Sequence, residues 1–391
     1  MEHNDIRAFS LYMSSAEQGN PYASLELAKM YRDGFGTEPD LQQAEWRFQN
    51  AYSGFVVLEE KSHDDKLQYR IGQMLHTGTG TSKDDEGAAR YWEKSAKLGN
   101  INAQYALGTL WLETGSGDSG QAVEWLTKAA NAEHSAAQYV LGKLYQDGVY
   151  FNKDMDQAMK WFRSAAELGN EYAAYRMGCL LLLGEEIPKD VEAAVKWLSL
   201  SAEKGNPYAQ YRLGMLYLKG EEFSPQVEVA MKWLQQAAEQ KNEWVFYQLG
   251  KLYLSGEHVT KNVETAVHYL GLCAEKGNQY AQYVLGKLYL CGRDVSRDRE
   301  KAVEYLTASA EQGNLYASFL LEHLDAYQDP SLFLAATRLL HHLEKLFCEE
   351  VQRPMEMKRY QIDRKRRRKL SEKKQAQGHH RDDQEPAQGI Y

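Results

Sequence analysis

The sequence is poor in cysteine, with only four in 391 residues. Cys179, Cys273, Cys291 and Cys348 follow no regular spacing, so no disulfide framework is indicated. Cys273 and Cys291 lie 18 residues apart on neighbouring predicted helices, close enough to meet. Because no secretion signal is evident, we instead expect the cysteines to be small buried residues in a reducing cytoplasm.

Long hydrophobic runs are also missing. No stretch approaches the roughly 20 apolar residues that a membrane-spanning helix needs. Residues 1–19 lack the basic start and apolar core of a signal peptide. We therefore predict a cytoplasmic protein with no membrane partner.

The common motifs of catalysis, metal binding and phosphate binding are absent as well. The sequence holds no H-E-x-x-H, no C-x-x-C and no phosphate loop. Its 11 histidines are scattered, and the adjacent pair His341 and His342 cannot both face one metal ion from a helix. His379 and His380 would chelate only weakly in a flexible tail. We predict a protein that is not an enzyme, with no catalytic residue, metal or cofactor.

Charge is unevenly divided along the chain. The formal net charge is −9, but residues 351–391 hold 12 Lys and Arg against 6 Asp and Glu. Residues 1–350 hold 34 basic and 49 acidic residues. The chain is therefore an acidic array of −15 followed by a basic tail of +6.

What the sequence has in abundance is repetition. The phrase Y-x-L-G-x-L-Y-L-x-G recurs every 36 residues, and its first tyrosines are Tyr139, Tyr175, Tyr211, Tyr247 and Tyr283, preceded by shifted copies at Tyr69 and Tyr105. A period near 34 is typical of helix-turn-helix repeats. Such repeats stack into an extended surface rather than a catalytic cleft, which favours a binding function.

One repeat, residues 206–241, shows how each unit is built. Asn206 is a good N-cap, Pro207 suits the first helical position, and Gly220 ends the first helix. A second helix follows, with an alanine and, three residues on, a large aromatic residue. Mid-helix glycine costs about 1 kcal/mol relative to alanine, so its regular return in seven repeats predicts a packing role, with the aromatic residues filling the opposite side. The glycines are Gly72, Gly108, Gly142, Gly178, Gly214, Gly250 and Gly286, and the aromatic residues are Tyr91, Trp125, Trp161, Trp197, Trp233, Tyr269 and Tyr305.

The whole chain divides into a solenoid, residues 1–348, and a tail, residues 349–391. The solenoid begins with an orphan helix at 6–18, continues as repeats over about 20–328, and ends in an irregular capping helix at 331–348. A longer connection near 53–66 precedes the second full repeat. The tail is expected to be disordered or loosely helical.

These motifs resemble Sel-1-like repeats, which are related to tetratricopeptide repeats. The resemblance rests on G-N-x-x-A-x-Y-x-L-G-x-L-Y-x-x-G, plainest at 205–220, and on A-x-x-W-x-x-x-A-A-E-x-G-N, plainest at 158–170. It covers roughly residues 6–330. It implies an all-α fold, a right-handed α-α superhelix of about nine repeats, acting as a scaffold or adaptor for protein-protein interaction.

By analogy with tetratricopeptide arrays, the inner face takes columns two, five, nine, twelve and thirteen of each first helix, counted from the N-cap as zero. Column two is mostly aromatic, column five is nearly always tyrosine, and column nine is lysine in the last repeats. We predict that repeats five to nine hold a protein or peptide segment, acidic or aromatic in character. Packing remains the alternative role for column five, and a solvated surface for column nine. The predicted partner-binding residues are Tyr172, Tyr175, Tyr208, Tyr211, Trp244, Tyr247, Lys251, Tyr280, Tyr283 and Lys287.

The basic tail suggests a second hypothesis, non-specific contact with DNA or RNA through phosphates. A solubilising tail and contact with acidic lipid are the alternatives. The nucleic-acid residues would be Arg364, Lys365, Arg366, Arg367, Arg368, Lys369, Lys373 and Lys374.

Residues 361–383 also resemble the end of MobP/MobL-type relaxases of Firmicutes conjugative elements. This resemblance implies a role in mobilising DNA, as an accessory protein or a separated C-terminal portion of a relaxase. The nicking domain of those enzymes, with its catalytic and metal-binding residues, has no counterpart here, so nicking activity is not implied.

Overall fold

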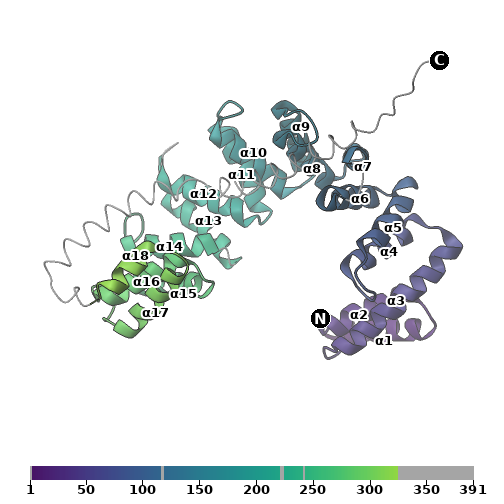
Figure 1. The fold of residues 1–391 in the computed structure, drawn as a ribbon, viewed down its shortest axis with the longest axis horizontal. Helices are drawn as coiled ribbons and strands as arrows, with labels where there is room; N and C mark the ends of the chain where they lie inside the picture. The colour runs from purple at the N-terminus through teal and green to yellow at the C-terminus, as the bar shows by residue number, and fades with distance from the viewer. Residues whose placement is uncertain (1, 116–118, 221–223, 241–242, 325–391) are drawn as a thin grey trace, which may run out of the picture. The chain divides into compact units, whose positions relative to one another are not determined.

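The computed structural model describes residues 2–115, 119–220, 224–240 and 243–324. Over these ranges every regular element is an α-helix, as predicted (Figure 1). The helices are α1 (Glu2–Glu17), α2 (Pro21–Asp33), α3 (Leu41–Ser62), α4 (Asp65–Thr77), α5 (Asp85–Lys97), α6 (Ile101–Thr114), α7 (Ser119–Asn131), α8 (Ser135–Asp147), α9 (Met155–Glu167), α10 (Glu171–Leu183), α11 (Val191–Glu203), α12 (Pro207–Lys219), α13 (Val227–Glu239), α14 (Glu243–Ser255), α15 (Val263–Glu275), α16 (Gln279–Cys291), α17 (Arg299–Glu311) and α18 (Leu315–Glu322).

The helices alternate between two types, which we call A and B. The even-numbered helices α2 to α18 are A helices, and α2, α4, α6, α8, α10, α14 and α16 each pack on the B helix that follows. Helix α12 meets α13 at Gly214 and Leu234. Helix α1 packs on α2 as a B helix does, and it begins four residues before the helix that was predicted at 6–18. The chain forms two compact units, residues 1–209 and residues 210–391, whose border falls within α12.

Helix α12 starts and ends where the sequence predicts. The Asn206 side chain accepts hydrogen bonds from the backbone N–H groups of Tyr208 and Ala209, at 3.0 and 3.1 Å. Asparagine or aspartate caps most other helices in the same way, Asp190 before α11 among them. Gly220 closes α12 with a φ of 63°, a left-handed conformation that glycine adopts without strain.

The recurring mid-helix glycines are packing residues, as predicted, but their partners lie one residue further along. A Cβ on Gly250 would sit 2.6 Å from Cγ of Leu270, so only glycine lets α14 and α15 approach this closely. Leu270 follows the half-buried Tyr269, which the sequence analysis had chosen as the filling residue. The observed pairs are Gly72–Trp92, Gly108–Leu126, Gly142–Phe162, Gly178–Leu198, Gly214–Leu234, Gly250–Leu270 and Gly286–Leu306.

Buried hydroxyl groups tie the B helix to the A helix of the same repeat. The hydroxyl of Ser201 in α11 donates a 2.7 Å hydrogen bond to the carbonyl oxygen of Glu171, the first residue of α10. Ser95 and Ser309 make the equivalent bonds to Asp65 and Gln279, at 2.6 and 2.7 Å. Because a buried donor without an acceptor costs free energy, these bonds fix the register of the pair.

The extra residues of the first full repeat are helical. The sequence analysis placed a longer connection near 53–66, whereas α3 continues without a break from Leu41 to Ser62, 22 residues where the other B helices from α5 to α17 have 13. His63 ends it in a left-handed conformation, with φ at 51°. The insertion therefore lengthens one helix instead of adding a loop.

Cys179 and Cys273 are buried, as expected of small apolar residues, and Cys291 is half-buried. The predicted capping helix at 331–348 and the tail at 349–391 lie outside the described residues. Among the helices that the structure does describe, none is long and apolar enough to cross a membrane.

Candidate functional site

Tyrosines of successive A helices form ring-to-ring rungs. The column-five tyrosine of one A helix contacts the column-two aromatic ring of the next. In the unit of residues 210–391, the centroids of Tyr247 and Tyr280 lie 6.4 Å apart, and those of Tyr283 and Tyr316 lie 6.1 Å apart. In the unit of residues 1–209, the rungs are Tyr139–Tyr172 at 6.4 Å and Tyr175–Tyr208 at 6.2 Å. Predicted columns two and five therefore do meet, across the boundary between repeats.

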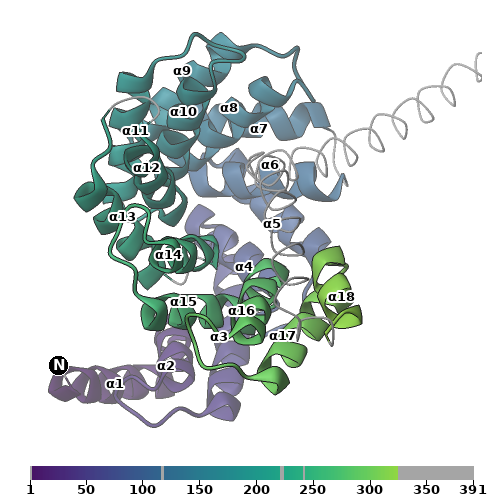
Figure 2. The ribbon, with the colours of Figure 1, turned by 90° about the vertical axis from the view of Figure 1, so that its left-hand side faces the viewer.

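A lysine at column nine lies over the column-five ring of its own helix. The ammonium nitrogen of Lys251 is 5.7 Å from the ring centroid of Tyr247, and that of Lys287 is 6.0 Å from the ring of Tyr283. Distances up to about 6 Å allow attraction between a cation and an aromatic face. Helices α14 and α16, whose ribbons are labelled in Figure 2, therefore each carry column-five and column-two rings with a lysine beside the column-five ring.

The predicted partner-binding residues differ in exposure. Tyr172 and Tyr208 are exposed, at 51 % and 46 %. Trp244, Tyr247 and Tyr280 are half-buried, whereas Tyr283 is buried. Burial raises the pKa of Tyr211, although the neighbouring Arg212 lowers it in part. The column-two rings present the larger contact area, and the column-five rings support them.

The ladder is interrupted between α4 and α6. Column two, which is Tyr172, Tyr208 or Tyr280 further along, is Asn102 in α6 and Ala136 in α8. Among the described residues, no aromatic ring stacks on Tyr69, the column-five tyrosine of α4. Tyr105 of α6 instead stacks on His134, at 4.6 Å.

A hollow of about 250 Å³ lies at this interruption, and we call it the α4–α6 hollow. Its lining comes mostly from columns five, nine, twelve and thirteen, the same columns that were predicted to form the inner face. Trp92 of α5 also lines it; this residue takes the place that leucine or phenylalanine holds in the other glycine pairs. The lining residues are Tyr69, Gln73, His76, Thr77, Trp92, Tyr105, Ala106, Thr109, Leu110 and Glu113.

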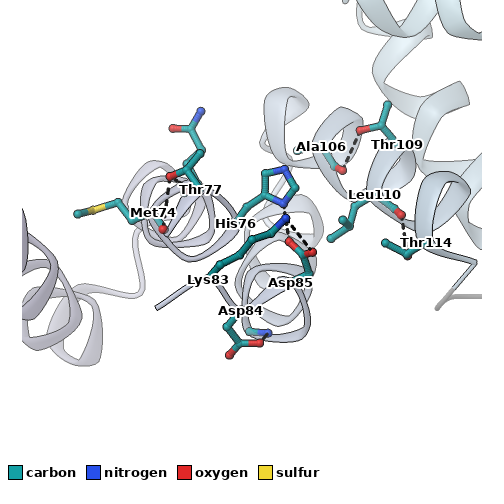
Figure 3. Close-up of polar contacts among 12 residues, drawn as sticks. Met74, His76, Thr77, Lys83, Asp84, Asp85, Ala106, Thr109, Leu110 and Thr114 are labelled. Carbon is teal, nitrogen blue, oxygen red and sulfur yellow. Dashed lines mark hydrogen bonds and ion pairs between the residues drawn. The ribbon is translucent and has the colours of Figure 1, made fainter. Parts of the chain in front are cut away.

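A charged cluster borders the hollow (Figure 3). Nδ1 of His76 lies 2.7 Å from a carboxylate oxygen of Asp85, and Nζ of Lys83 lies 3.4 Å from the other. Partial burial acts to raise the pKa of Asp85, but the hydrogen bonds from His76 and Lys83 outweigh it and lower the pKa. The carboxylate is therefore ionised at neutral pH, and Nδ1 of His76 is the donor.

The hollow was not predicted from the sequence, because it results from a missing side chain and not from a motif. The signal was an absence, the aromatic residue missing from column two at Asn102 and Ala136. The replacement of leucine by Trp92 in a B helix was a second visible departure.

The predicted nucleic-acid residues, Arg364 to Lys374, lie outside the described residues. The resemblance of residues 361–383 to relaxase tails concerns the same segment. Both the DNA contact and the mobilisation role stay predictions from sequence.

Stacked helix pairs joined through glycine contacts and asparagine or aspartate caps define an α-solenoid repeat protein. The Sel1 repeat profile matches nine stretches, residues 1–20, 21–46, 66–100, 101–134, 135–170, 171–206, 207–242, 247–278 and 279–314. These stretches cover well over half of the sequence. The chain belongs to the Sel1 repeat family.

Solved structures share this architecture. A Sel1 repeat protein from Oxalobacter formigenes is 32% identical, with a TM-score of 0.54 over 72% of this chain and 79% of that one. The protein c5321, a protective antigen of uropathogenic Escherichia coli, is 29% identical, with a TM-score of 0.59 over 79% of this chain and 65% of that one.

Curated relatives match over shorter stretches. Chitin synthase regulatory factor 1 of Schizosaccharomyces pombe is 28% identical over 157 residues, which is 39% of this chain and 32% of that protein. The chain spans about a third or less of the length of the first curated relatives it matches.

Proposed function

We propose that the chain is a protein-interaction scaffold, and that the A-helix face of α14 and α16 binds an acidic, aromatic-containing segment of a partner protein. The observation that carries this proposal is the repeated rung of two aromatic rings and a lysine. The rung recurs with the same geometry at Tyr247–Tyr280 with Lys251 and at Tyr283–Tyr316 with Lys287.

The chemistry of the rung explains the choice of ligand. The half-buried tyrosines of the rungs, Tyr247, Tyr280 and Tyr316, have two rotatable side-chain bonds and offer a large contact area at little entropic cost. The lysines beside them offer charge-assisted hydrogen bonds to carboxylates of the partner. Because successive rungs repeat along the solenoid, an extended segment would meet the same pair of contacts at regular intervals.

Membership of the Sel1 family supports the role of a protein-interaction scaffold, since a regulatory factor of chitin synthase is among the relatives. The site itself is proposed from the rungs alone. The inferred partner segment carries glutamate or aspartate at the spacing of the lysines and an aromatic residue between them.

The test is binding of a labelled peptide rich in Glu and Tyr to the full chain, with Lys251→Glu and Lys287→Glu combined. Reversal of both charges should lower the affinity at least about tenfold, or ~1.4 kcal/mol. The control pair, Lys232→Glu with Lys301→Glu, makes the same change of net charge on the B helices α13 and α17. Equal affinity in all three proteins would show that the lysines of the rungs do not bind the segment.

A further inference from the structure

Helix α1 is the one B helix of the described residues that no A helix precedes (Figures 1 and 2). A Gly-Asn pair, Gly19 and Asn20, follows it, as such a pair follows α5, α9, α11, α15 and α17. Counting back from this pair places Ala8, Tyr12 and Ser15 at three positions that contact the A helix in a complete repeat. In α17 the residues at these positions are Ala302, Leu306 and Ser309, and each of them contacts α16.

These three positions are uncovered in α1. In every other B helix that the structure describes, the residues at these positions are buried. In α1, by contrast, Tyr12 is 38 % exposed, and Leu11 on the same side of the helix is 64 % exposed. Ala8 and Ser15 are only half-buried. These four side chains form an uncharged and mostly apolar surface, which we call the α1 face.

Two hydrogen-bond donors at the end of α1 indicate what this face lacks. In a complete repeat, the serine donates to the backbone of the first residue of the A helix, as Ser95 does to Asp65 at 2.6 Å. The asparagine after the B helix donates to the same residue, as Asn100 does to the Asp65 carboxylate at 2.8 Å. Beside α1, Nδ2 of Asn20 donates instead to the Ser15 hydroxyl, at 3.1 Å. Within the described part of the chain, the hydroxyl hydrogen of Ser15 has no acceptor.

The complete repeats define the geometry of a helix that would fit the α1 face. Their A helix runs antiparallel to the B helix, with its first residue at the serine and a glycine seven residues later at the position of Tyr12. That glycine accommodates a large ring, since Phe162 and Trp92 occupy the position of Tyr12 in their repeats. A Cβ on Gly142 would lie 2.6 Å from the Phe162 ring. A helix anchored at Ser15 therefore needs glycine opposite Tyr12.

The remaining pattern and the charge of the occupant follow from the same unit. In α8, the A helix that carries Gly142, the neighbouring buried residues are Ala137 and Leu141. Helix α1 holds three acidic residues and one basic residue, and residues 1–209 hold 30 Asp and Glu against 20 Lys and Arg. A second copy of the chain would bring the same negative charge to the α1 face, whereas a helix with basic edges is attracted to it.

We propose that the α1 face docks an amphipathic helix of a partner protein, which takes the place of an A helix in the first repeat. The docked helix runs antiparallel to α1, with the carbonyl oxygen of its first residue at the Ser15 hydroxyl and a glycine against Tyr12. Lysine or arginine residues lie along its edges. The α1 face is separate from the rungs of α14 and α16, so this docking does not depend on Lys251 and Lys287.

The probe is a fluorescent peptide that copies residues 135–148, with Gln146→Lys and Asp147→Lys to make it basic. Its matched control also carries Gly142→Leu, which keeps the charge and favours the helix, because leucine has the higher helix propensity. Fluorescence anisotropy measures the binding of both peptides to the full chain, and hydrogen exchange locates the amides that become protected. We expect only the glycine peptide to bind and the protected amides to lie in α1.

Two exposed apolar residues of α1 supply matched variants of the protein. Leu11 lies on the α1 face, whereas Ile6, with a similar exposure of 59 %, lies five residues away and so about 140° around the helix. Leu11→Glu should weaken binding of the glycine peptide at least about tenfold, because it places a charge against an apolar helix. Ile6→Glu makes the same change of charge and should leave the affinity unchanged. Tyr12→Leu, which restores the residue found in α17, should keep the affinity.

Equal affinity for the two peptides would overturn the proposal, and so would equal affinity of the wild type, Leu11→Glu and Ile6→Glu for the glycine peptide. Sedimentation of the full chain distinguishes the other possible occupant. A dimer that Leu11→Glu dissociates and Ile6→Glu does not would assign the α1 face to a second copy of the chain, and this result contradicts docking of a partner helix.

Discussion

The A-helix faces of α4–α6 and α14–α16 are built on the same columns, yet their chemistry is opposite. Around α14 and α16, two aromatic rings and a lysine repeat as a rung. Around α4 and α6, the column-two ring is missing at Asn102, and a hollow opens there whose lining includes Gln73, Thr109 and Glu113 and no lysine. The comparison shows how a repeat protein varies the chemistry of its surface, because the glycine contacts stay constant while single columns change.

If the two faces differ only in their surface columns, the glycine contacts beneath them should respond alike to the same change. We expect Gly108→Ala in one unit and Gly250→Ala in the other each to lower the free energy of unfolding by about 1–3 kcal/mol, because each new Cβ would overlap the leucine opposite. Chemical denaturation of the full chain, together with hydrogen exchange of the affected helices, measures this loss.

Gly271→Ala is the matched control, since a Cβ at this position in α15 meets no atom within 4 Å. It should raise the stability by about 0.5–1 kcal/mol, the usual gain of alanine over glycine in a helix. If Gly108→Ala destabilised the chain and Gly250→Ala did not, the two units would not share one packing scheme.

One junction next to the hollow should respond to pH. Most junctions between repeats carry the pair Gly-Asn. At the junction between α7 and α8 this pair is replaced by Glu133, whose φ is 60°, and His134. Nδ1 of His134 caps α8 by accepting from the backbone N–H of Ala137 at 3.2 Å. Burial lowers the pKa of His134, only partly opposed by a backbone hydrogen bond, so the folded state favours the neutral ring.

The contribution of this cap is present above about pH 6.5 and is lost as the pH falls below that value, since the unfolded chain then binds the proton more readily. As the pH falls, we expect the free energy of unfolding of the wild type to drop by about 1 kcal/mol relative to that of His134→Asn. This is the usual contribution of an N-cap. Thermal unfolding of both proteins from pH 7.5 to pH 5 measures the difference. Parallel curves over the whole range would contradict the role of the neutral ring as the cap.

A single substitution should make the face of α4 and α6 resemble that of α14 and α16. Asn102→Tyr supplies the missing column-two ring next to Tyr69, in the position that Tyr172 holds next to Tyr139. The new ring pair should add about 0.5–1 kcal/mol of stability. It should also fill the hollow, because the new ring would lie next to Tyr69, which lines it. Asn102→Ala, which adds no ring, should not raise the stability, and thermal unfolding of the two variants measures the difference.

The sequence alone predicted most of the fold because the repeat signals are local. Asn206 as a cap and Gly220 as a helix end follow from backbone hydrogen bonding and from glycine's conformational freedom. The partner of the glycine column was placed one residue too early, at Tyr269 instead of Leu270, because the rotation of one helix against another is set by tertiary packing. The hollow was missed since its cause is a side chain that Asn102 does not have.

The assignment of partner-binding columns remains a prediction, although columns two and five do meet in the rungs. Sequence could place these residues on one helix face. It could not show that Tyr283 is buried and that Tyr172 and Tyr208 are exposed.

The most direct test of the account is a pair of peptide titrations on the full chain, one with a Glu- and Tyr-rich peptide and one with the basic copy of residues 135–148. Each is repeated with Lys251→Glu plus Lys287→Glu and with Leu11→Glu. The account predicts that the lysine variant loses only the acidic peptide and that Leu11→Glu loses only the basic helical peptide. If both variants lost both peptides, or neither lost any, the rungs and the α1 face would not have the separate specificities assigned to them.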